Sequence, residues 1–278
     1  MNGQVQGKVV LVTGAASGIG EAAARLFKQE GAILVLADVN DVTGRALAAD
    51  LDASFILTDV SLEEQVEHAV AYAVERHGRI DCMINNAGVV GAVGSIMDTT
   101  AQAWRATQAV LLDSVFFGIK HAARQMREQR GGAILSLASI AGIMGGLGPH
   151  AYTAAKHGVV GLTRSAAAEL SQYGIRVNAV APGTTVTPMI DAVRGSREKA
   201  LEGASRVSPL GTAIMPDEIA AALLFLASDA AAHITAHTLV IDSGVTGAGF
   251  ASGASVLRDR PVAFIGPSGQ HSPDKEQS

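Results

Sequence analysis

Short apolar segments alternate with longer amphipathic segments along most of this 278-residue chain. The apolar segments are rich in Val, Ile and Leu, as expected for strands that are buried on both faces of a parallel sheet. The amphipathic segments between them have the length of the helices that connect such strands. The alternation therefore predicts an α/β protein of the doubly wound kind, in which helices cover both faces of one parallel sheet.

Seven segments have the character of strands, which is a natural number for one sheet. The strands are predicted at residues 8–13, 33–38, 54–58, 82–85, 133–138, 175–180 and 238–241. Several of the helices predicted between them follow a residue that can cap a first turn. The helices are predicted at residues 18–30, 41–51, 61–77, 100–129, 151–173 and 216–227. Since no linker interrupts this pattern, one domain is expected over residues 1–244. The Gly-, Ser- and Pro-containing segment 245–278 is expected to be a partly mobile extension.

The composition restricts the partners and the location of the protein. Hydrophobic residues make up 48% of the chain and charged residues 17%, which indicates a large core and buried subunit contacts. The net charge of -5 and the lack of a Lys/Arg cluster argue against nucleic acid or an anionic membrane as partner. No apolar run approaches the ~20 residues of a membrane-spanning helix. With Cys82 as the single cysteine and no signal peptide before the first strand, a reducing cytoplasm is the expected location.

A glycine-rich turn directly follows the first predicted strand. Residues 13–20 read T-G-A-A-S-G-I-G and open the first predicted helix. Glycines allow a tight backbone, and the unpaired N–H groups of a helix N-terminus bind phosphate. Within a strand–helix–strand unit of about 30 residues, such a turn is the fingerprint of dinucleotide binding. A pyrophosphate is therefore expected at this turn.

Asp38 ends the second predicted strand, 18 residues after Gly20. A carboxylate at this position accepts hydrogen bonds from the adenosine ribose and repels a 2′-phosphate. Neither Arg nor Lys follows at positions 39 and 40, and Ser17 in the glycine turn is neutral. These features favour NAD over NADP. The alternative that Asp38 only caps a helix or a turn stays open.

Tyr152 and Lys156 lie one helical turn apart, and Ser139 precedes Tyr152 by 13 residues. Because positions i and i+4 share a face of a helix, the ammonium group can favour phenolate over phenol. A free tyrosine titrates near about 10, which is too high for a base at neutral pH. The pattern Y-x-x-x-K alone is common on helices. Together with Ser139 it predicts a proton-transfer site for alcohol chemistry.

Five motifs occur in the order and spacing of the short-chain dehydrogenase/reductase family, which the chain resembles from about residue 7 to 244. They are T-G-x-x-x-G-I-G, N-N-A-G at 85–88, Ser139, Y-x-x-x-K and P-G at 182–183. The resemblance implies a Rossmann-type fold and NAD-dependent interconversion of an alcohol and a ketone. It also implies that Tyr152 is the acid/base, that Lys156 binds the nicotinamide ribose and lowers the pKa of the tyrosine, and that Ser139 hydrogen-bonds the substrate oxygen.

The same resemblance implies a complete cofactor site. Asp59 and Val60 are expected at the adenine, Ile19 at the diphosphate, and Thr187 at the nicotinamide carboxamide. The residues implied in cofactor binding are Gly14, Ser17, Gly18, Ile19, Gly20, Asp38, Asp59, Val60, Asn86, Ala87, Gly88, Tyr152, Lys156, Pro182, Gly183 and Thr187.

Leu111 stands where the family usually has an asparagine on its long fourth helix. In related proteins that side chain anchors a helix kink, and its backbone carbonyl holds a water in the proton relay to the lysine. Leucine keeps the carbonyl and loses the anchor, so the expected consequence is activity that survives at a reduced rate. Asp113 does not replace the amide, because two residues along a helix it points about 160° away.

The expected substrate is a neutral, hydrophobic secondary alcohol or ketone of the alicyclic, terpenoid or steroid-like kind. By family likeness the loop after Gly88 and the segments 140–151 and 184–209 line the pocket, and their apolar side chains offer no charged anchor. The alternative that many of these side chains belong to the core stays open.

His233 and His237 have the spacing of metal ligands but no third ligand nearby, so no metal is expected. Family likeness also implies a homotetramer with dimer contacts through the long fourth and fifth helices.

Two other functions remain open at this stage. A 3-oxoacyl-carrier-protein reductase shares the motifs but typically uses NADPH and a basic entrance patch, against which Asp38 and the acidic balance argue. A non-catalytic NAD-binding regulatory protein is the second alternative, and Leu111 is its sole support.

Overall fold

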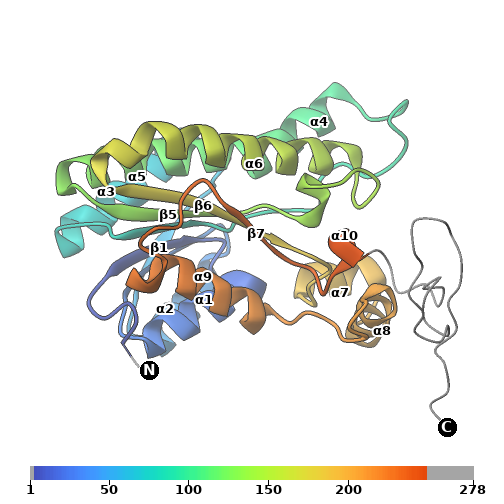
Figure 1. Ribbon diagram of the computed structural model, residues 1–278, viewed down its shortest axis with the longest axis horizontal. Helices are drawn as coiled ribbons and strands as arrows, with labels where there is room; N and C mark the ends of the chain where they lie inside the picture. The colour runs from blue at the N-terminus through green and yellow to red at the C-terminus, as the bar shows by residue number, and fades with distance from the viewer. Residues whose placement is uncertain (1–2, 249–278) are drawn as a thin grey trace, which may run out of the picture.

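The computed structural model describes residues 3–248 and contains a seven-stranded parallel sheet between two layers of helices (Figure 1). The strand order is β3-β2-β1-β4-β5-β6-β7, and every neighbouring pair is parallel. The strands are β1 (Val9–Thr13), β2 (Ile33–Asp38), β3 (Ser54–Leu57), β4 (Cys82–Asn85), β5 (Gly132–Leu137), β6 (Ile175–Pro182) and β7 (Thr238–Ile241). The predicted doubly wound, Rossmann-type fold is confirmed.

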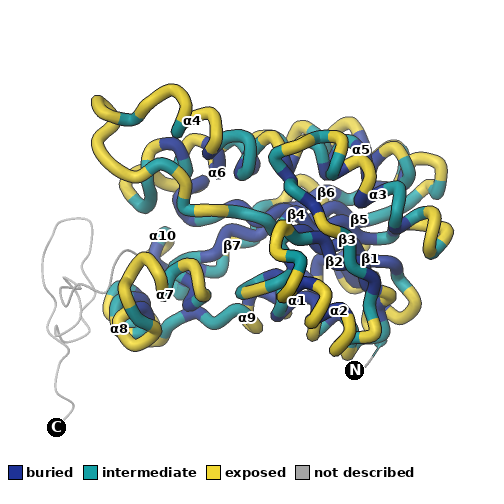
Figure 2. Tube along the Cα trace, turned by 180° about the vertical axis from the view of Figure 1, so that it is seen from behind, coloured by how far each residue is buried: buried dark blue, intermediate teal, exposed yellow. Residues whose placement is uncertain are grey.

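Helices α1, α2 and α9 cover one face of the sheet, and α3, α5 and α6 cover the other (Figure 1). The helices are α1 (Gly18–Gln29), α2 (Asp41–Asp50), α3 (Glu63–His77), α4 (Ala101–Gln108), α5 (Ser114–Gln129), α6 (His150–Leu170), α7 (Pro188–Arg194), α8 (Arg197–Val207), α9 (Pro216–Ala227) and α10 (Val245–Ala248). Each face of the sheet buries its own cluster of apolar side chains, with Phe27 and Leu223 in one and Ile119 and Val159 in the other. The strands are buried at the centre, and the exposed residues lie on the outer helices and loops (Figure 2).

The helix predicted over residues 100–129 is interrupted in the structure. A π-helical segment, Ala109–Asp113, separates α4 from α5. Its wider turns disturb the backbone hydrogen bonds, and the Ser114 hydroxyl donates to the Val110 carbonyl at 2.7 Å. Leu111 lies in the middle of this segment and is only 1% exposed. The helix is therefore distorted at the expected place although leucine stands where the family has its asparagine anchor.

The segment 184–209, predicted as a variable loop, contains the helices α7 and α8. Thr187 caps α7 by accepting from the Ile190 N–H at 3.4 Å, and Ser196 caps α8 by accepting from the Lys199 N–H at 3.3 Å. The sequence indicates both caps, because a Thr or a Ser precedes each helical segment. The apolar side chains of α7 and α8 form a small cluster that is separate from the two main core clusters. The sequence therefore shows no long apolar periodicity that would have predicted these two helices. Of the predicted extension, 245–248 form α10 and 249–278 lie outside the described residues.

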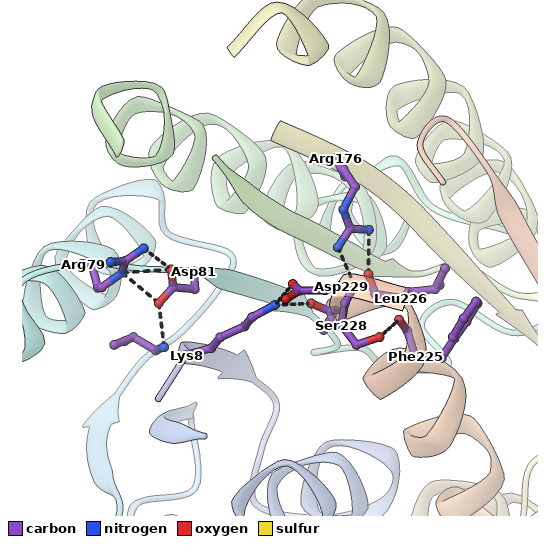
Figure 3. A network of polar contacts seen from close by, with 10 residues as sticks. Lys8, Arg79, Asp81, Arg176, Phe225, Leu226, Ser228 and Asp229 are labelled. Atoms are coloured by element: carbon purple, nitrogen blue, oxygen red, sulfur yellow. Dashed lines mark hydrogen bonds and ion pairs between the residues drawn. The ribbon is translucent and has the colours of Figure 1, made fainter. Parts of the chain in front are cut away.

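Polar contacts join the amino ends of several strands to α9 at the edge of the sheet opposite the sequence motifs (Figure 3). Arg176 at the start of β6 donates to the Leu226 carbonyl at 2.7 Å in the last turn of α9. Lys8, which precedes β1, forms an ion pair with Asp229 at 2.6 Å just beyond the same helix. A cation at a helix C-terminus satisfies carbonyls that have no intrahelical partner and stabilises the helix dipole. The polar side chains at this edge therefore hold the strands to α9, and the predicted catalytic and cofactor-binding residues lie at the opposite edge.

Ala236 has a left-handed backbone, with φ of 60°, in the exposed turn before β7. An L-residue with a Cβ costs about 1–2 kcal/mol in this conformation, whereas glycine adopts it freely at an entropic cost of about 0.5–1 kcal/mol. Ala236→Gly is therefore expected to raise the free energy of unfolding by about 1 kcal/mol, measured by urea denaturation. The matched control is Ala232→Gly, because Ala232 is also exposed but has a right-handed backbone. Glycine there should destabilise the protein, and equal effects at both positions would contradict the strain at residue 236.

Candidate active site

The carboxyl ends of the parallel strands meet at one edge of the sheet, and each sequence motif lies at that edge. The edge carries the glycine turn after β1, Asp38 at the end of β2, Asp59 and Val60 after β3, residues 86–88 after β4, Ser139 after β5, and Pro182 and Gly183 at the end of β6. The strand order reverses between β1 and β4, which is where doubly wound folds have their ligand crevice. The structure thus brings the predicted site residues to one crevice.

The glycine turn after β1 is joined directly to the loop after β4. The Asn86 side-chain amide donates to the carbonyls of Thr13 at 3.0 Å and Gly14 at 2.9 Å. Gly14 has φ of 64°, and a Cβ there would lie 2.6 Å from Ala87 Cα. Only glycine therefore allows the two loops to approach this closely. Asn86 and Ala87 thereby fix the turn against the central strand, as the sequence indicated.

The glycine turn fits the diphosphate of a dinucleotide. A Cβ at Gly20 would lie 2.1 Å from the Gly14 carbonyl oxygen, so the turn closes only with glycine. At Gly18, which has φ of 58°, a Cβ would lie 3.4 Å from the Thr187 side chain. Ser17 is the N-cap of α1, and its side chain makes no capping hydrogen bond. The first N–H groups of the helix can therefore donate to a ligand. An open helix N-terminus with a backbone cradle is a phosphate site.

Asp38 supports the glycine turn and keeps acceptor capacity for a ribose. Its carboxylate accepts hydrogen bonds from the Ala16 N–H and the Asn40 N–H, both at 2.8 Å. The cap of α2 is Asn40, which accepts from the Thr43 N–H at 3.2 Å, so Asp38 is not a helix cap. An ionised carboxylate has about four acceptor sites, of which these contacts use two. The remaining lone pairs can accept ribose hydroxyls.

The loop after β3 holds the residues expected at the adenine. The Asp59 carboxylate accepts from both the backbone N–H and the hydroxyl of Ser61, at 2.9 and 2.7 Å. The Asp59 N–H in turn donates to the Gln65 side chain at 2.7 Å. Val60 is buried beside them, and Ile19 packs partly against the core. Their contacts to a nucleotide stay predictions.

Ser139, Tyr152 and Lys156 meet where α6 crosses the end of β5. Lys156 is 4% exposed, and its ammonium donates to the Leu137 carbonyl at 2.6 Å. The same nitrogen lies 5.6 Å from the centre of the Tyr152 ring. Ser139 lies close enough to Tyr152 for its hydroxyl to influence the pKa of the phenol, and Ser139 Oγ accepts from the Ala141 N–H at 3.1 Å. The three predicted catalytic residues therefore form one cluster.

Burial dominates the electrostatics of this cluster. It raises the pKa of Tyr152 above the ordinary value, and the hydrogen bond with Ser139 opposes the rise. Burial also lowers the pKa of Lys156 to about 8. The ammonium of Lys156 is turned toward the Leu137 carbonyl, and the lowering of the tyrosine pKa by Lys156 stays a prediction. A phenol with a raised pKa is well suited to donate a proton at neutral pH and needs a further positive charge to act as a base.

Two glycines that the sequence did not single out let the loop after β5 pack against α6. A Cβ at Gly142 would lie 2.6 Å from the Lys156 carbonyl oxygen, and one at Gly148 would lie 3.2 Å from the Tyr152 ring. Both values leave no room, or almost none, for a larger residue. The two glycines therefore let the loop pack closely against α6, and this packing brings Ser139 close to Tyr152. Glycine abundance alone does not reveal which glycines make such contacts.

A cavity of about 220 Å³ adjoins this loop, between the loop, α8 and the turn from β7 to α10. Its walls are made by Ile140, Gly146, Leu147, Thr184, Arg194, Ala204, Val207, Ser208, Thr212, Ile214, Asp242, Ser243 and Val245. The expectation of a pocket without charged side chains is wrong, because Arg194 and Asp242 are among its walls. Of the apolar residues expected there, Leu147 is in the wall, whereas Val93 and Met97 are exposed. Of the two charged wall residues, Arg194 lies at the end of α7, which Thr187 caps, and Asp242 directly follows β7.

Asp242 is a buried, hydrogen-bonded anion in the cavity wall. Its carboxylate accepts from the N–H groups of Gly244 and Thr246, at 2.8 and 2.7 Å, and from the Thr246 hydroxyl. Burial alone would raise its pKa, but these hydrogen bonds together lower the pKa below its usual range. Gly183, at the end of β6, passes close to it, since a Cβ there would lie 3.0 Å from Asp242 Cα. The anion disfavours a negatively charged ligand in the cavity.

Within residues 3–248, no group of three or more His, Cys, Asp or Glu side chains has the arrangement of a metal site. Over the same residues, no helix has the length and apolar character to cross a membrane.

Comparisons with known proteins agree with this architecture. A family model described as enoyl-(acyl carrier protein) reductase matches residues 14–246. Short-chain dehydrogenase reductase 4 of Arabidopsis thaliana is 44% identical over 86% of this chain and 83% of its own. The mitochondrial borneol dehydrogenase of Lavandula x intermedia is 43% identical over 87% of this chain and 92% of its own. The crystal structure of levodione reductase has a TM-score of 0.82 and 40% identity, covering 87% of this chain and 99% of that one.

The match spans the glycine turn, the cluster around Tyr152 and the cavity, so the resemblance covers the whole crevice. The chain belongs to the short-chain dehydrogenase/reductase family, and it is an oxidoreductase that acts on CH–OH groups with a nicotinamide cofactor.

Proposed function

We propose that the protein is an NAD-dependent dehydrogenase that interconverts a neutral, hydrophobic secondary alcohol and its ketone. The observation that carries the proposal is the cluster of Ser139, Tyr152 and Lys156 at the carboxyl edge of the sheet, next to Ile140, which is part of the cavity wall. A substrate in the cavity can present its oxygen to both hydroxyls while its carbon faces the crevice. This is the arrangement required for proton transfer beside an oxidisable carbon.

The chain's own residues would hold the substrate and move one proton. Bound in the crevice, the nicotinamide cofactor supplies the acceptor or donor of hydride, and in its oxidised form a positive charge. Tyr152 takes the proton from the alcohol oxygen during oxidation and returns it during reduction. Ser139 donates a hydrogen bond to the same oxygen as its negative charge grows. Lys156 adds positive charge at the end of β5, where it is held by the Leu137 carbonyl.

The substrate class rests on the cavity and on the relatives. The buried anion of Asp242 disfavours an acidic substrate, and most of the remaining wall is apolar or carries neutral hydroxyls. The Lavandula relative is named a borneol dehydrogenase, and the structural relative is a levodione reductase. An alicyclic or terpenoid alcohol is therefore the proposed substrate class.

NAD is proposed as the cofactor because a 2′-phosphate would meet the Asp38 carboxylate. Like-charge contacts of this kind cost several kcal/mol, so kcat/KM with NAD should exceed that with NADP by roughly 10²-fold. The test measures reduced-nicotinamide absorbance over a panel of alicyclic and terpenoid alcohols with each cofactor. Asp38→Asn should narrow the preference roughly tenfold, since it removes the charge and keeps one acceptor oxygen. Asp41→Asn is the matched control, because Asp41 lies at the start of α2 and pairs with Arg45. A preference for NADP would overturn the assignment of Asp38.

Members of this family generally form oligomers, and we propose a homotetramer with dimer contacts through the long helices predicted at residues 100–129 and 151–173, which correspond to α4 with α5 and to α6. Exposed Trp104 and Phe116 on these helices support the proposal. The cytoplasmic location expected from the sequence stays a prediction.

A further inference from the structure

The side-chain amide of Gln108 is hydrogen-bonded to the first turn of α6, the helix that carries Tyr152. Gln108 is the last residue of α4, and its Nε2 donates to the Ala151 carbonyl at 2.9 Å. The two helices lie side by side at this end of α6 (Figure 1). Ala151 is 1% exposed, and its carbonyl belongs to the rigid peptide unit that joins it to Tyr152. Gln108 therefore holds the peptide group next to the proposed acid/base.

The first turn of α6 has little other support. Its N-cap is Pro149, whose side chain makes no capping hydrogen bond, and a helix end without a cap is less stable. Thr153 Oγ1 donates to the Gly148 carbonyl at 3.2 Å, but both residues belong to this same end of the helix. In the described part of the chain, Gln108 is the one side chain from another element that is hydrogen-bonded to the backbone of this turn.

A second contact holds α6 about two turns further along. Leu112, in the π-helical segment that follows Gln108, packs against Gly158, where a Cβ would lie 2.9 Å from Leu112 Cδ1. Positions 151 and 158 are seven residues apart and therefore share one face of α6. Tyr152 and Lys156 lie between these two positions, about 100° and 140° around the helix from position 151. The two contacts therefore fix the rotation of α6, and with it the direction in which the Tyr152 side chain points.

The hydrogen bond from Gln108 orients the helix more than it completes it. Helical geometry already pairs the Ala151 carbonyl with the N–H of residue 155, and a carbonyl oxygen has a second lone pair for the glutamine. Loss of the amide therefore leaves no buried carbonyl without a partner. An apolar side chain of the same length would also fill the half-buried place between α4 and α6.

We propose that Gln108 is a positioning residue of the reaction, which holds Tyr152 at the substrate oxygen through the Ala151 carbonyl. The inference rests on the proposed function, in which Tyr152 transfers the proton. Proton transfer requires the phenol within hydrogen-bond reach of that oxygen, and a displacement of about 1 Å can lower a rate about 10²-fold. Because Gln108 acts through α6, its loss should slow the chemical step and leave the affinity for NAD unchanged.

The experiment compares three variants that differ in what residue 108 can donate. Gln108→Met keeps the length without a donor, Gln108→Glu puts a carboxylate oxygen in place of the donor, and Gln108→Lys keeps a donor on a chain of similar length. The rate of hydride transfer is measured in single turnovers with saturating NAD and the fastest alcohol among borneol, menthol and cyclohexanol. Calorimetry measures NAD binding. The rate should fall about tenfold in Gln108→Met and Gln108→Glu, with the Kd for NAD unchanged, whereas Gln108→Lys should keep most of the wild-type rate.

Backbone hydrogen exchange tests the anchoring without any turnover. Exchange over residues 149–158, followed by mass spectrometry, should be faster in Gln108→Met than in the wild type, because the first turn of α6 opens more often. Gln108→Lys should exchange as the wild type does. Faster exchange in Gln108→Met, together with a wild type that oxidises no alcohol, would support the anchoring by Gln108 and refute the proposed reaction.

The control variant is Gln102→Met, at an exposed position on the same helix. It should keep both the rate and the exchange of the wild type. An undiminished rate in Gln108→Met would overturn the inference. Equal losses in Gln108→Met and Gln108→Lys would overturn it too, since they would assign residue 108 to packing and not to the hydrogen bond. A loss of NAD affinity as large as the loss of rate would show that the whole crevice is distorted, and would likewise contradict a positioning role.

Discussion

Tyr152→Phe is expected to lower kcat for alcohol oxidation by two to four orders of magnitude while NAD binding is retained. The range is the usual contribution of a positioned acid/base group, about 10²–10⁴-fold. The phenylalanine ring fills the same space against Gly148 and the loop after β5, so the cavity and the crevice keep their shape. The substitution removes only the phenolic oxygen, which is the proposed proton acceptor of the cluster. Rapid-mixing kinetics with saturating NAD would measure the loss.

The pH dependence makes this prediction specific to a proton transfer. Burial raises the pKa of Tyr152, so the phenolate fraction and the oxidation rate of the wild type should rise with pH across the neutral range. The residual rate of Tyr152→Phe should lack this rise. Tyr173→Phe serves as the control because Tyr173 lies at the far end of α6, beside β6, and should leave both the rate and its pH profile intact. An unchanged rate in Tyr152→Phe would remove the basis of the proposed function.

The sequence predicted the sheet because each strand carries its own local signal. All seven strands were placed within about two residues of their observed bounds, since a buried parallel strand is a short apolar run between a turn and a helix. The motif residues also followed from local pattern, because most of them come directly after a strand, while Tyr152 and Lys156 share one face of α6. Parallel pairing then brings the ends of the strands to a common edge without further information.

The cavity and the helix break could not be predicted in the same way. Ser208 and Asp242 meet at the cavity from segments that have no motif in common, and their partners are decided by tertiary packing. The π segment around Leu111 depends on how α4 and α5 pack against α6, and leucine is an ordinary helix residue. The orientation of the Lys156 ammonium was not predictable either, because a spacing of four residues shows that Lys156 is near Tyr152 but not that its ammonium turns to the Leu137 carbonyl.

The stability of the wild type is expected to rise between about pH 8 and pH 10.5 relative to that of Lys156→Met. In the folded protein burial lowers the pKa of Lys156 to about 8, from an ordinary value of 10.5. Below pH 8 the ammonium is charged in both states, and the folded state bears the full cost of burying it. Between the two values the unfolded chain binds the proton and the folded chain releases it, so the free energy of unfolding increases with pH. The two values correspond to about 3 kcal/mol.

Methionine has a similar length and no charge, so Lys156→Met should lack this contribution at every pH. Urea denaturation of both proteins without added cofactor, at intervals from pH 7 to pH 10, measures the difference in unfolding free energy. The difference should move in favour of the wild type by about 2–3 kcal/mol over this range. Lys199→Met, at an exposed position on α8, should follow the wild type. A difference between wild type and Lys156→Met that stays constant with pH would show that the ammonium keeps its ordinary pKa. Lys156 would then hold its charge in alkaline solution instead of releasing its proton near pH 8.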